Sequence, residues 1–204
     1  MKNIYNFILE KLVLNKDTKI IKYKYFPQTK DELKKIIKER LANDSNADLN
    51  DIDVSKITDM GNLFYDLDPH NIDISKWNVS NVLYMDSMFD KCINFNSDLS
   101  NWDVSNVEDM QCTFYGCINF NSDLSKWDVS NVKYMFRMFD ECAKFNSDLS
   151  NWDVSKVKDM QHMFLNCKSF NSDLSRWNVS NVKYMWHMFD GCNSMKKLPE
   201  WYHS

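Results

Sequence analysis

The sequence predicts a repeat solenoid of the leucine-rich-repeat type, in which short parallel strands, turns and irregular or short helical arcs follow an N-terminal α/β cap. Two observations predict this fold class. From Asp53 onward the 204-residue chain consists of six successive copies of a 25-residue unit, and the same apolar positions recur in nearly every copy. A single unit of this kind cannot bury its apolar face, whereas stacked units bury a continuous core. We therefore expect a cap over residues 1–52, a solenoid over 53–193 and a C-terminal tail over 194–204.

The segment ahead of the repeats begins with an ambiguous stretch. Residues 3–14 fit either a helix or the first strand of a hairpin that turns at residues 15–18. Isoleucine and tyrosine then alternate with lysine over residues 21–25, which predicts a strand running up to Pro27.

A helix is predicted next, because Thr29 and Glu32 have the spacing of a capping box and apolar residues follow at helical intervals to about Leu41. We expect the strand and the helix to cover the first repeat, since an uncovered coil would expose strand edges.

The repeats share one apolar pattern. In the second copy it comprises Val79, Val82, Met85, Met88, Phe89, Cys92, Phe95, Leu99 and Trp102. The segment from Leu99 to Val104 is predicted to be the short strand of each coil, because Trp and Val suit a pleated, half-buried surface. Residues 85–92 are expected to form a helical turn or an irregular arc. The first and last copies are atypical, as the ends of a stack require.

The run Leu-x-x-Trp-Asp-Val-Ser-Asn-Val, followed by Met, Met-Phe, Cys and Phe-Asn, recurs nearly letter for letter over about residues 49–193. In this it resembles the BspA-like leucine-rich repeat family, and more narrowly the 25-residue branch first noted in mycoplasma surface proteins. The resemblance implies a curved solenoid. It also implies roles in adhesion or protein binding, often at bacterial or parasite surfaces.

Composition and charge exclude several classes of function. Residues 1–43 carry 11 Lys and Arg against 5 Asp and Glu, and the remainder carries 14 against 24. An acidic array repels a phosphate backbone, so we expect no nucleic-acid partner. No apolar run is long enough to span a membrane. No secretory signal or lipid-anchor cysteine is recognisable near the start, which predicts a cytoplasmic protein, while the family resemblance keeps a surface location open.

Cysteine and glycine usage adds two expectations. Five cysteines recur every 25 residues, namely Cys92, Cys117, Cys142, Cys167 and Cys192. Residues that recur in this way stack in a column, where a Cys acts as a small buried hydrophobe, so we expect free thiols. The chain has only three glycines. Its turns should therefore rely on Asn, Asp and Ser, which bond locally to the backbone and tolerate unusual dihedrals.

Two further columns alternate between copies, so the duplicated unit is a pair of 50 residues. One of them reads Asp59, Tyr84, Asp109, Tyr134, Asp159 and Tyr184. Alternation separates charges that would repel if identical Asp residues were stacked. We expect Tyr phenols to bond to Asp on the next coil.

Variable positions are the better functional clue, because packing does not dictate them. Two adjacent columns vary freely and present aromatic, Arg and His residues in the C-terminal copies, and aromatics and Arg are the usual anchors of interfaces. The alternative is that these side chains merely cover the outside of the stack. The candidate partner-binding residues are Phe136, Arg137, Gln161, His162, Trp186 and His187.

Nothing in the sequence indicates catalysis or a cofactor. Phosphate-binding glycine loops and nucleophile-elbow motifs are absent. A ladder of Asp beside Asn could bind calcium, but the favoured interpretation is that these residues accept backbone N–H bonds in turns. His162 and His187 share a column, yet a zinc site needs about four ligands. We therefore expect no catalytic residue and no metal.

The sequence thus predicts a non-catalytic protein-interaction module on a rigid solenoid, with an unidentified protein as partner. The alternative is a bacterial surface adhesin or matrix-binding protein exported without a recognisable signal. The oligomeric state is left open.

Overall fold

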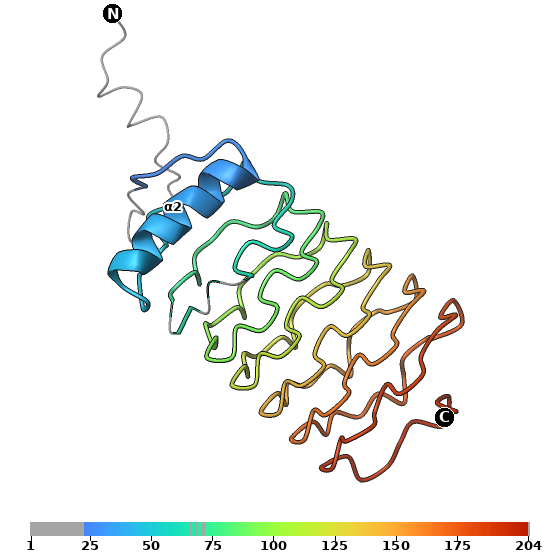
Figure 1. Cartoon of the computed structure of the whole chain (residues 1–204). Helices are drawn as coiled ribbons and strands as arrows, with labels where there is room; N and C mark the ends of the chain where they lie inside the picture. Colours follow the sequence, from blue (N-terminus) through green and yellow to red (C-terminus); the bar gives the residue numbers. More distant parts are fainter. Residues whose placement is uncertain (1–22, 66, 68, 71, 204) are drawn as a thin grey trace, which may run out of the picture.

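The computed structural model describes residues 23–65, 67, 69–70 and 72–203. The fold is compact and largely irregular. Within the described residues one helix, α2 (Lys30–Asn43), is present, and strand pairing is confined to isolated bridges. Figure 1 shows α2 at one end, followed by successive turns of chain that lie side by side as far as the C-terminus.

Adjacent units are joined by parallel bridges between equivalent residues 25 positions apart, with backbone hydrogen bonds beside them. Parallel bridges link each residue of one column, hereafter the bridge column, to the next: Asp59, Tyr84, Asp109, Tyr134, Asp159 and Tyr184. Backbone N–H groups on the C-terminal side of each bridge then donate to carbonyls of the following unit. From the fourth unit to the fifth, for example, Met135 donates to Asp159 at 2.9 Å and Arg137 to Gln161 at 3.0 Å.

The strand predicted over Leu99–Val104 is wrong. That segment turns, because the N–H of Trp102 donates to the carbonyl of Leu99 at 3.1 Å. The Asp98 carboxylate accepts the N–H of Ser100 at 2.9 Å and fixes the turn. Residues 85–92 form the irregular arc that was predicted, with turn bonds such as Cys92 to Phe89 at 2.9 Å.

Aromatic side chains form a long periodic ladder in the core. Phenylalanines one unit apart stack nearly parallel, with ring centroids 5.1 Å (Phe64–Phe89) to 6.0 Å (Phe145–Phe170) apart. Tryptophans stack beside them, at 6.4 Å for Trp77–Trp102. Offset stacking of this kind adds about 0.5–1.5 kcal/mol per pair beyond burial.

The apolar pattern predicted for the repeats is confirmed as the core. All nine residues named for the second copy are buried, the most exposed being Trp102 at 4%. In the stacked tryptophans from Trp102 to Trp177, each indole also donates to a backbone carbonyl of the preceding unit; Trp127 Nε1, for example, donates to the Leu99 carbonyl at 2.9 Å. The polar edge of each tryptophan is therefore paired inside the core, as buried polar groups require.

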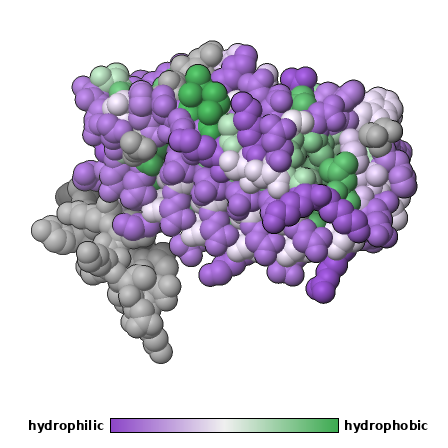
Figure 2. Space-filling model, turned by 90° about the horizontal axis from the view of Figure 1, so that it is seen from below, coloured by the Kyte–Doolittle hydropathy of each residue, from purple (hydrophilic) through white to green (hydrophobic). Residues whose placement is uncertain are grey.

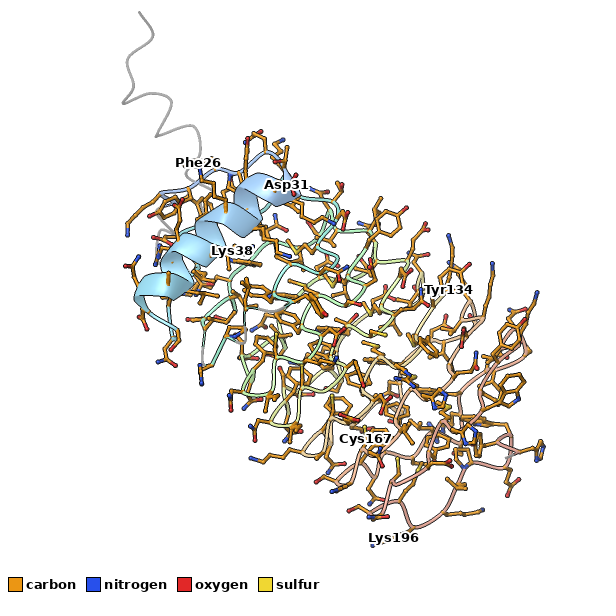
Figure 3. The ribbon with its side chains drawn as sticks, in the orientation of Figure 1. Phe26, Asp31, Lys38, Tyr134, Cys167 and Lys196 are labelled. Atoms are coloured by element: carbon orange, nitrogen blue, oxygen red, sulfur yellow. The ribbon has the colours of Figure 1, made fainter. Side chains whose placement is uncertain are left out.

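The cysteine column lies within this core, and Figure 3 places Cys167 inside the stack. Each thiol donates to a phenylalanine carbonyl of the preceding unit, with Cys142 Sγ 2.9 Å from the Phe114 oxygen and Cys167 Sγ 2.9 Å from the Phe139 oxygen. Burial raises the pKa of the Cys142 and Cys167 thiols well above the ordinary value. All six cysteines are free thiols in the structure.

Helix α2 begins where the capping box predicts. The Thr29 side chain accepts the N–H of Glu32, while the Glu32 carboxylate reaches back to the N–H of Gln28 at 2.7 Å. Leu33 and Ile37 are completely buried in the same cluster as the apolar residues of the first unit. The helix therefore shares the core of the repeats.

Polar contacts hold α2 to the repeats as well. Lys30 Nζ lies 2.6 Å from Asp59, and Lys34 Nζ donates to the Asn62 carbonyl at 2.8 Å. The strand predicted for residues 21–25 survives as a single bridge between Tyr25 and Ile52. Its first two residues, and the ambiguous residues 3–18, lie outside the described residues.

Left-handed backbone recurs twice in the repeating unit, and the prediction that Asn, Asp and Ser would carry unusual dihedrals is only partly right. One left-handed column includes Ser87 (φ 54°) and Arg137 (φ 53°), and the other includes Gly116 (φ 71°) and Glu141 (φ 64°). Non-glycine residues adopt this conformation at a cost of roughly 1–2 kcal/mol. The hydrogen bonds to adjacent units hold these residues in place.

The tryptophan column continues beyond Cys192. Trp201 stacks on Trp177 with centroids 6.3 Å apart, and its Nε1 donates to the Leu174 carbonyl at 2.9 Å. One residue fewer separates Trp201 from Cys192 than separates Trp177 from Cys167. The segment expected as a tail thus follows the repeat with a one-residue deletion.

Candidate functional site

The six candidate residues, hereafter the lateral patch, come together on the surface of the last three units. They follow the bridge column by two and three positions, so the unit-to-unit hydrogen bonds set their spacing. The N–H of Arg137 donates to Gln161, and the N–H of His162 donates to Trp186, each at 3.0 Å. Figure 3 shows Tyr134, the bridge residue beside Phe136, on the outside of the stack.

Arg137 has a structural partner that the sequence analysis missed. Its guanidinium lies 5.5 Å from the ring centroids of Tyr115 and Phe136, and its Nε is 3.6 Å from Asp140 Oδ2. Only 2% of the Asp140 side chain is exposed. Burial raises the pKa of Asp140 to about 6, and the charge of Arg137 opposes that rise. Arg137 therefore compensates a buried carboxyl group.

The two histidines stack on each other, with ring centroids 5.3 Å apart. His162 meets Phe136 edge-to-face at 6.1 Å, and His187 Nδ1 lies 2.8 Å from Asp190 Oδ2. Burial, together with the positive charges of Arg137 and His187, lowers the pKa of His162. Phe136, Arg137, His162 and His187 therefore form one continuous row of contacts.

Gln161 and Trp186 differ in their availability to a partner. The Gln161 amide nitrogen lies 3.3 Å from Oδ1 of Asp159, its own neighbour in the chain. Trp186 is 59% exposed, the highest value among the large hydrophobic residues described, and meets Tyr184 edge-to-face at 5.9 Å. Trp186 is therefore the side chain of the lateral patch that is best placed to bind.

The sequence analysis also missed the tyrosines of the bridge column. Tyr84, Tyr134 and Tyr184 are exposed at 43%, 37% and 46%. The expected bonds from Tyr phenols to Asp of the next coil are not found among the described residues. Instead Asp109 accepts the N–H of Gln111 at 2.9 Å. The alternation of Asp and Tyr could have indicated these exposed tyrosines, since a Tyr that neither bonds to Asp nor enters the core faces solvent.

Charge changes sign along the stack. The first three units carry 4 Lys and Arg against 12 Asp and Glu, whereas residues 153–204 carry 7 against 5. Lys158 and Lys183 are exposed next to the bridge column, and Lys158 Nζ lies 6.0 Å from the Tyr134 ring. Figure 2 shows a mostly hydrophilic face with a few hydrophobic areas, one of them towards the C-terminal end. The lateral patch is thus aromatic with a basic border.

Polar side chains line several hollows of the described surface. One of them is lined by Asn, Ser and Asp side chains of residues 146–150 and 171–173 together with Arg176. These side chains form turns: Asp148, for example, accepts the N–H of Ser150 at 3.0 Å, which lowers its pKa. The described residues contain no group of three or more His, Cys, Asp or Glu that could hold a metal ion.

The chain was compared with known proteins. Residues 32–136 and 100–202 each match a family model described as a mycoplasma protein of unknown function, DUF285. No curated protein and no solved structure matches the chain. In the part that the structure describes, no helix has the length and apolar character needed to cross a membrane.

Proposed function

The chain belongs to the mycoplasma protein family of unknown function DUF285, and we propose that it is a non-catalytic protein-interaction module built on a rigid solenoid. The 25-residue spacing of the bridges supports a solenoid of leucine-rich-repeat type, related to the BspA-like repeats. The contacts of α2 with the first unit support its role as an N-terminal cap. Because backbone hydrogen bonds join the last three units to one another, the lateral patch keeps its shape without a ligand, which lowers the entropic cost of binding.

One observation carries the proposal: the chain exposes Trp186 beside Tyr184 on a surface bordered by lysines. Tryptophan, tyrosine and arginine are enriched among the residues that dominate the binding energy of protein interfaces, and a polar rim usually surrounds the core of an interface. The polar side chains that line the hollows form turns. The exposed aromatic residues therefore favour a binding function over a catalytic one.

We propose that the protein is cytoplasmic. Five thiols lie one coil apart in a column and are free. Free thiols at such spacing are typical of a reducing compartment. Fractionation of the native cells tests this proposal. The protein should be found in the soluble cytosolic fraction, and its presence on the cell surface would contradict the proposal.

The interaction is tested with a variant that spares Arg137, because its removal would leave Asp140 buried without a compensating charge. We expect the double variant Tyr184→Ala, Trp186→Ala to lose a protein that the wild-type chain captures from a lysate of the native cells. The matched control is Leu83→Ala, Ile93→Ala, which removes two exposed hydrophobic residues elsewhere on the stack.

The captured protein is then purified and titrated against all three chains by calorimetry. The proposal requires a loss of about 2 kcal/mol or more in the patch variant and little change in the control. Equal binding by both variants, or no protein retained by the wild type, would overturn it.

A further inference from the structure

In the sixth unit, the last one described, a row of backbone donors has no acceptor among the described residues. In the fifth unit the N–H groups of Met160, His162, Phe164 and Asn166 donate to carbonyls of the sixth at 2.7 to 3.0 Å. Their equivalents one unit on are Met185, His187, Phe189 and Gly191. Within the described residues, no hydrogen bond has the N–H of any of these four as its donor. An unpaired edge of this kind is a template for another chain.

The apolar interior is also open at this end. Val154, Val157 and Met160 are at most 1% exposed. Their equivalents in the last coil, Val179, Val182 and Met185, are only partly buried, as are Met195 and Trp201. At the opposite end α2 covers the first unit (Figure 1). The surface formed by the backbone of residues 184–191 and these apolar side chains is hereafter the open end.

We propose that the open end binds an extended acidic segment of a partner polypeptide, which adds in parallel to residues 184–191 as a further coil would. The four N–H donors require an occupant that presents carbonyl oxygens. An extended peptide that adds to the edge as a strand presents its backbone carbonyls in this way. Every earlier Tyr of the bridge column lies between two Asp residues, whereas Tyr184 has Asp159 on one side only. Lys183 stands exposed beside it, and in its column Lys133 pairs with Glu108 of the preceding unit at 2.6 Å.

A second copy of the chain does not supply this complement. Two open ends that meet would each present the same four N–H donors, so donors would face donors. The other end of a second copy is covered by α2, whose Leu33 and Ile37 are buried in the core. The occupant is therefore a segment of a different polypeptide. This inference rests on the proposed function only in assuming that the partner is a polypeptide.

A synthetic peptide provides the probe. Residues 108–116 occupy this register on the second unit, where Met85 donates to Asp109 at 2.9 Å and Lys91 to Tyr115 at 2.6 Å. The probe is EDMQSTFYG, which is that segment with Ser in place of Cys112. The control peptide KNMQSTFYG reverses its charge and keeps the rest.

Amide hydrogen exchange, followed by NMR, reads out the four donors individually. In the free chain they should exchange at least about 10²-fold faster than Met160, His162, Phe164 and Asn166, because paired amides are protected. Excess EDMQSTFYG should slow them about tenfold or more, and KNMQSTFYG should do so only weakly. Unchanged exchange at millimolar peptide would overturn the proposal, as would protection in the free chain that grows with protein concentration.

Two variants separate this site from the lateral patch. Met185→Pro deletes one donor and should weaken peptide binding about fivefold relative to Met185→Leu, since one hydrogen bond is lost. Tyr184→Ala, Trp186→Ala tests the lateral patch through the captured protein. Equal peptide affinity of the Pro and Leu variants would contradict the pairing, whatever the outcome for the captured protein.

Discussion

The Sγ of Cys142 donates a hydrogen bond to the carbonyl oxygen of Phe114, 2.9 Å away in the preceding coil. The thiol therefore packs as an apolar group and also bonds to the neighbouring coil. We expect Cys142→Ala to lower the free energy of unfolding by about 1–3 kcal/mol, through the lost bond and the cavity left behind. Urea denaturation measures this. Cys112→Ala, at the surface, is the control and should change stability by less than about 0.5 kcal/mol; equal stability of the two variants would contradict this role.

Thiol reactivity should distinguish the cysteine column from Cys112. The five column thiols are at most 7% exposed, whereas Cys112 is partly exposed. Burial, with nearby Asp charges, raises the pKa of Cys112 to about 11, so it should react slowly. In the native chain a thiol reagent should modify at most one cysteine, and in urea all six. Modification of three or more thiols under native conditions would show that the column is accessible.

The left-handed positions predict opposite effects for two substitutions. Gly116 has φ 71°, and a Cβ there would lie 3.4 Å from the Lys91 Cα, so Gly116→Ala should destabilise the chain by about 1 kcal/mol. Glu141 is its equivalent one unit on, at φ 64°, and Glu141→Gly should be neutral or stabilise by up to about 1 kcal/mol. Chemical denaturation of both variants checks the sign. If Glu141→Gly is instead destabilised, the Glu141 side chain contributes more to stability than its left-handed backbone costs.

Asp140 predicts a pH dependence of stability. Its pKa is about 6 in the folded chain against an ordinary 3.8, so the folded state binds a proton more tightly than the unfolded state. Its contribution is therefore complete below pH 4 and is lost as the pH rises through 6. Relative to Asp140→Asn, the wild type should lose at most about 3 kcal/mol between pH 4 and 7.

The control for this series is Asp148→Asn. The N–H of Ser150 lowers the pKa of Asp148, so its contribution is complete above pH 4. The difference between wild type and Asp148→Asn should stay constant from pH 4 to 7. A constant difference for Asp140→Asn as well would show that this carboxyl is not held protonated.

The core and the helix could be predicted from the sequence because burial repeats every 25 residues. Val82, Phe89 and Trp102 are buried as predicted, and α2 begins after Thr29. The strand of each unit was predicted at the wrong residues. Trp and Val favour strands generally, but the hydrogen bonds between units decide which residues form the bridges. The bridges pair Asp with Tyr, and Asp is depleted in strands although Tyr is enriched in them.

The lateral patch was predicted in position but not in detail. Phe136, Arg137, His162 and His187 do meet, because adjacent columns are fixed by the repeat. The sequence could not indicate that Arg137 turns onto Asp140, since this depends on a left-handed backbone at Arg137. Trp201 was missed as a member of the tryptophan column because a one-residue deletion breaks the period.

Deletion of residues 103–152 tests most directly the claim that the chain is a stack of interchangeable coils. The deletion removes one complete 50-residue pair and rejoins Trp102 to Asp153, so Asp159 would follow Tyr84 in the bridge column. The shortened chain should unfold cooperatively, and small-angle X-ray scattering should give a maximum dimension shorter by about 10 Å, two coil spacings. A chain that is unfolded, or folded with an unchanged maximum dimension, would contradict the account.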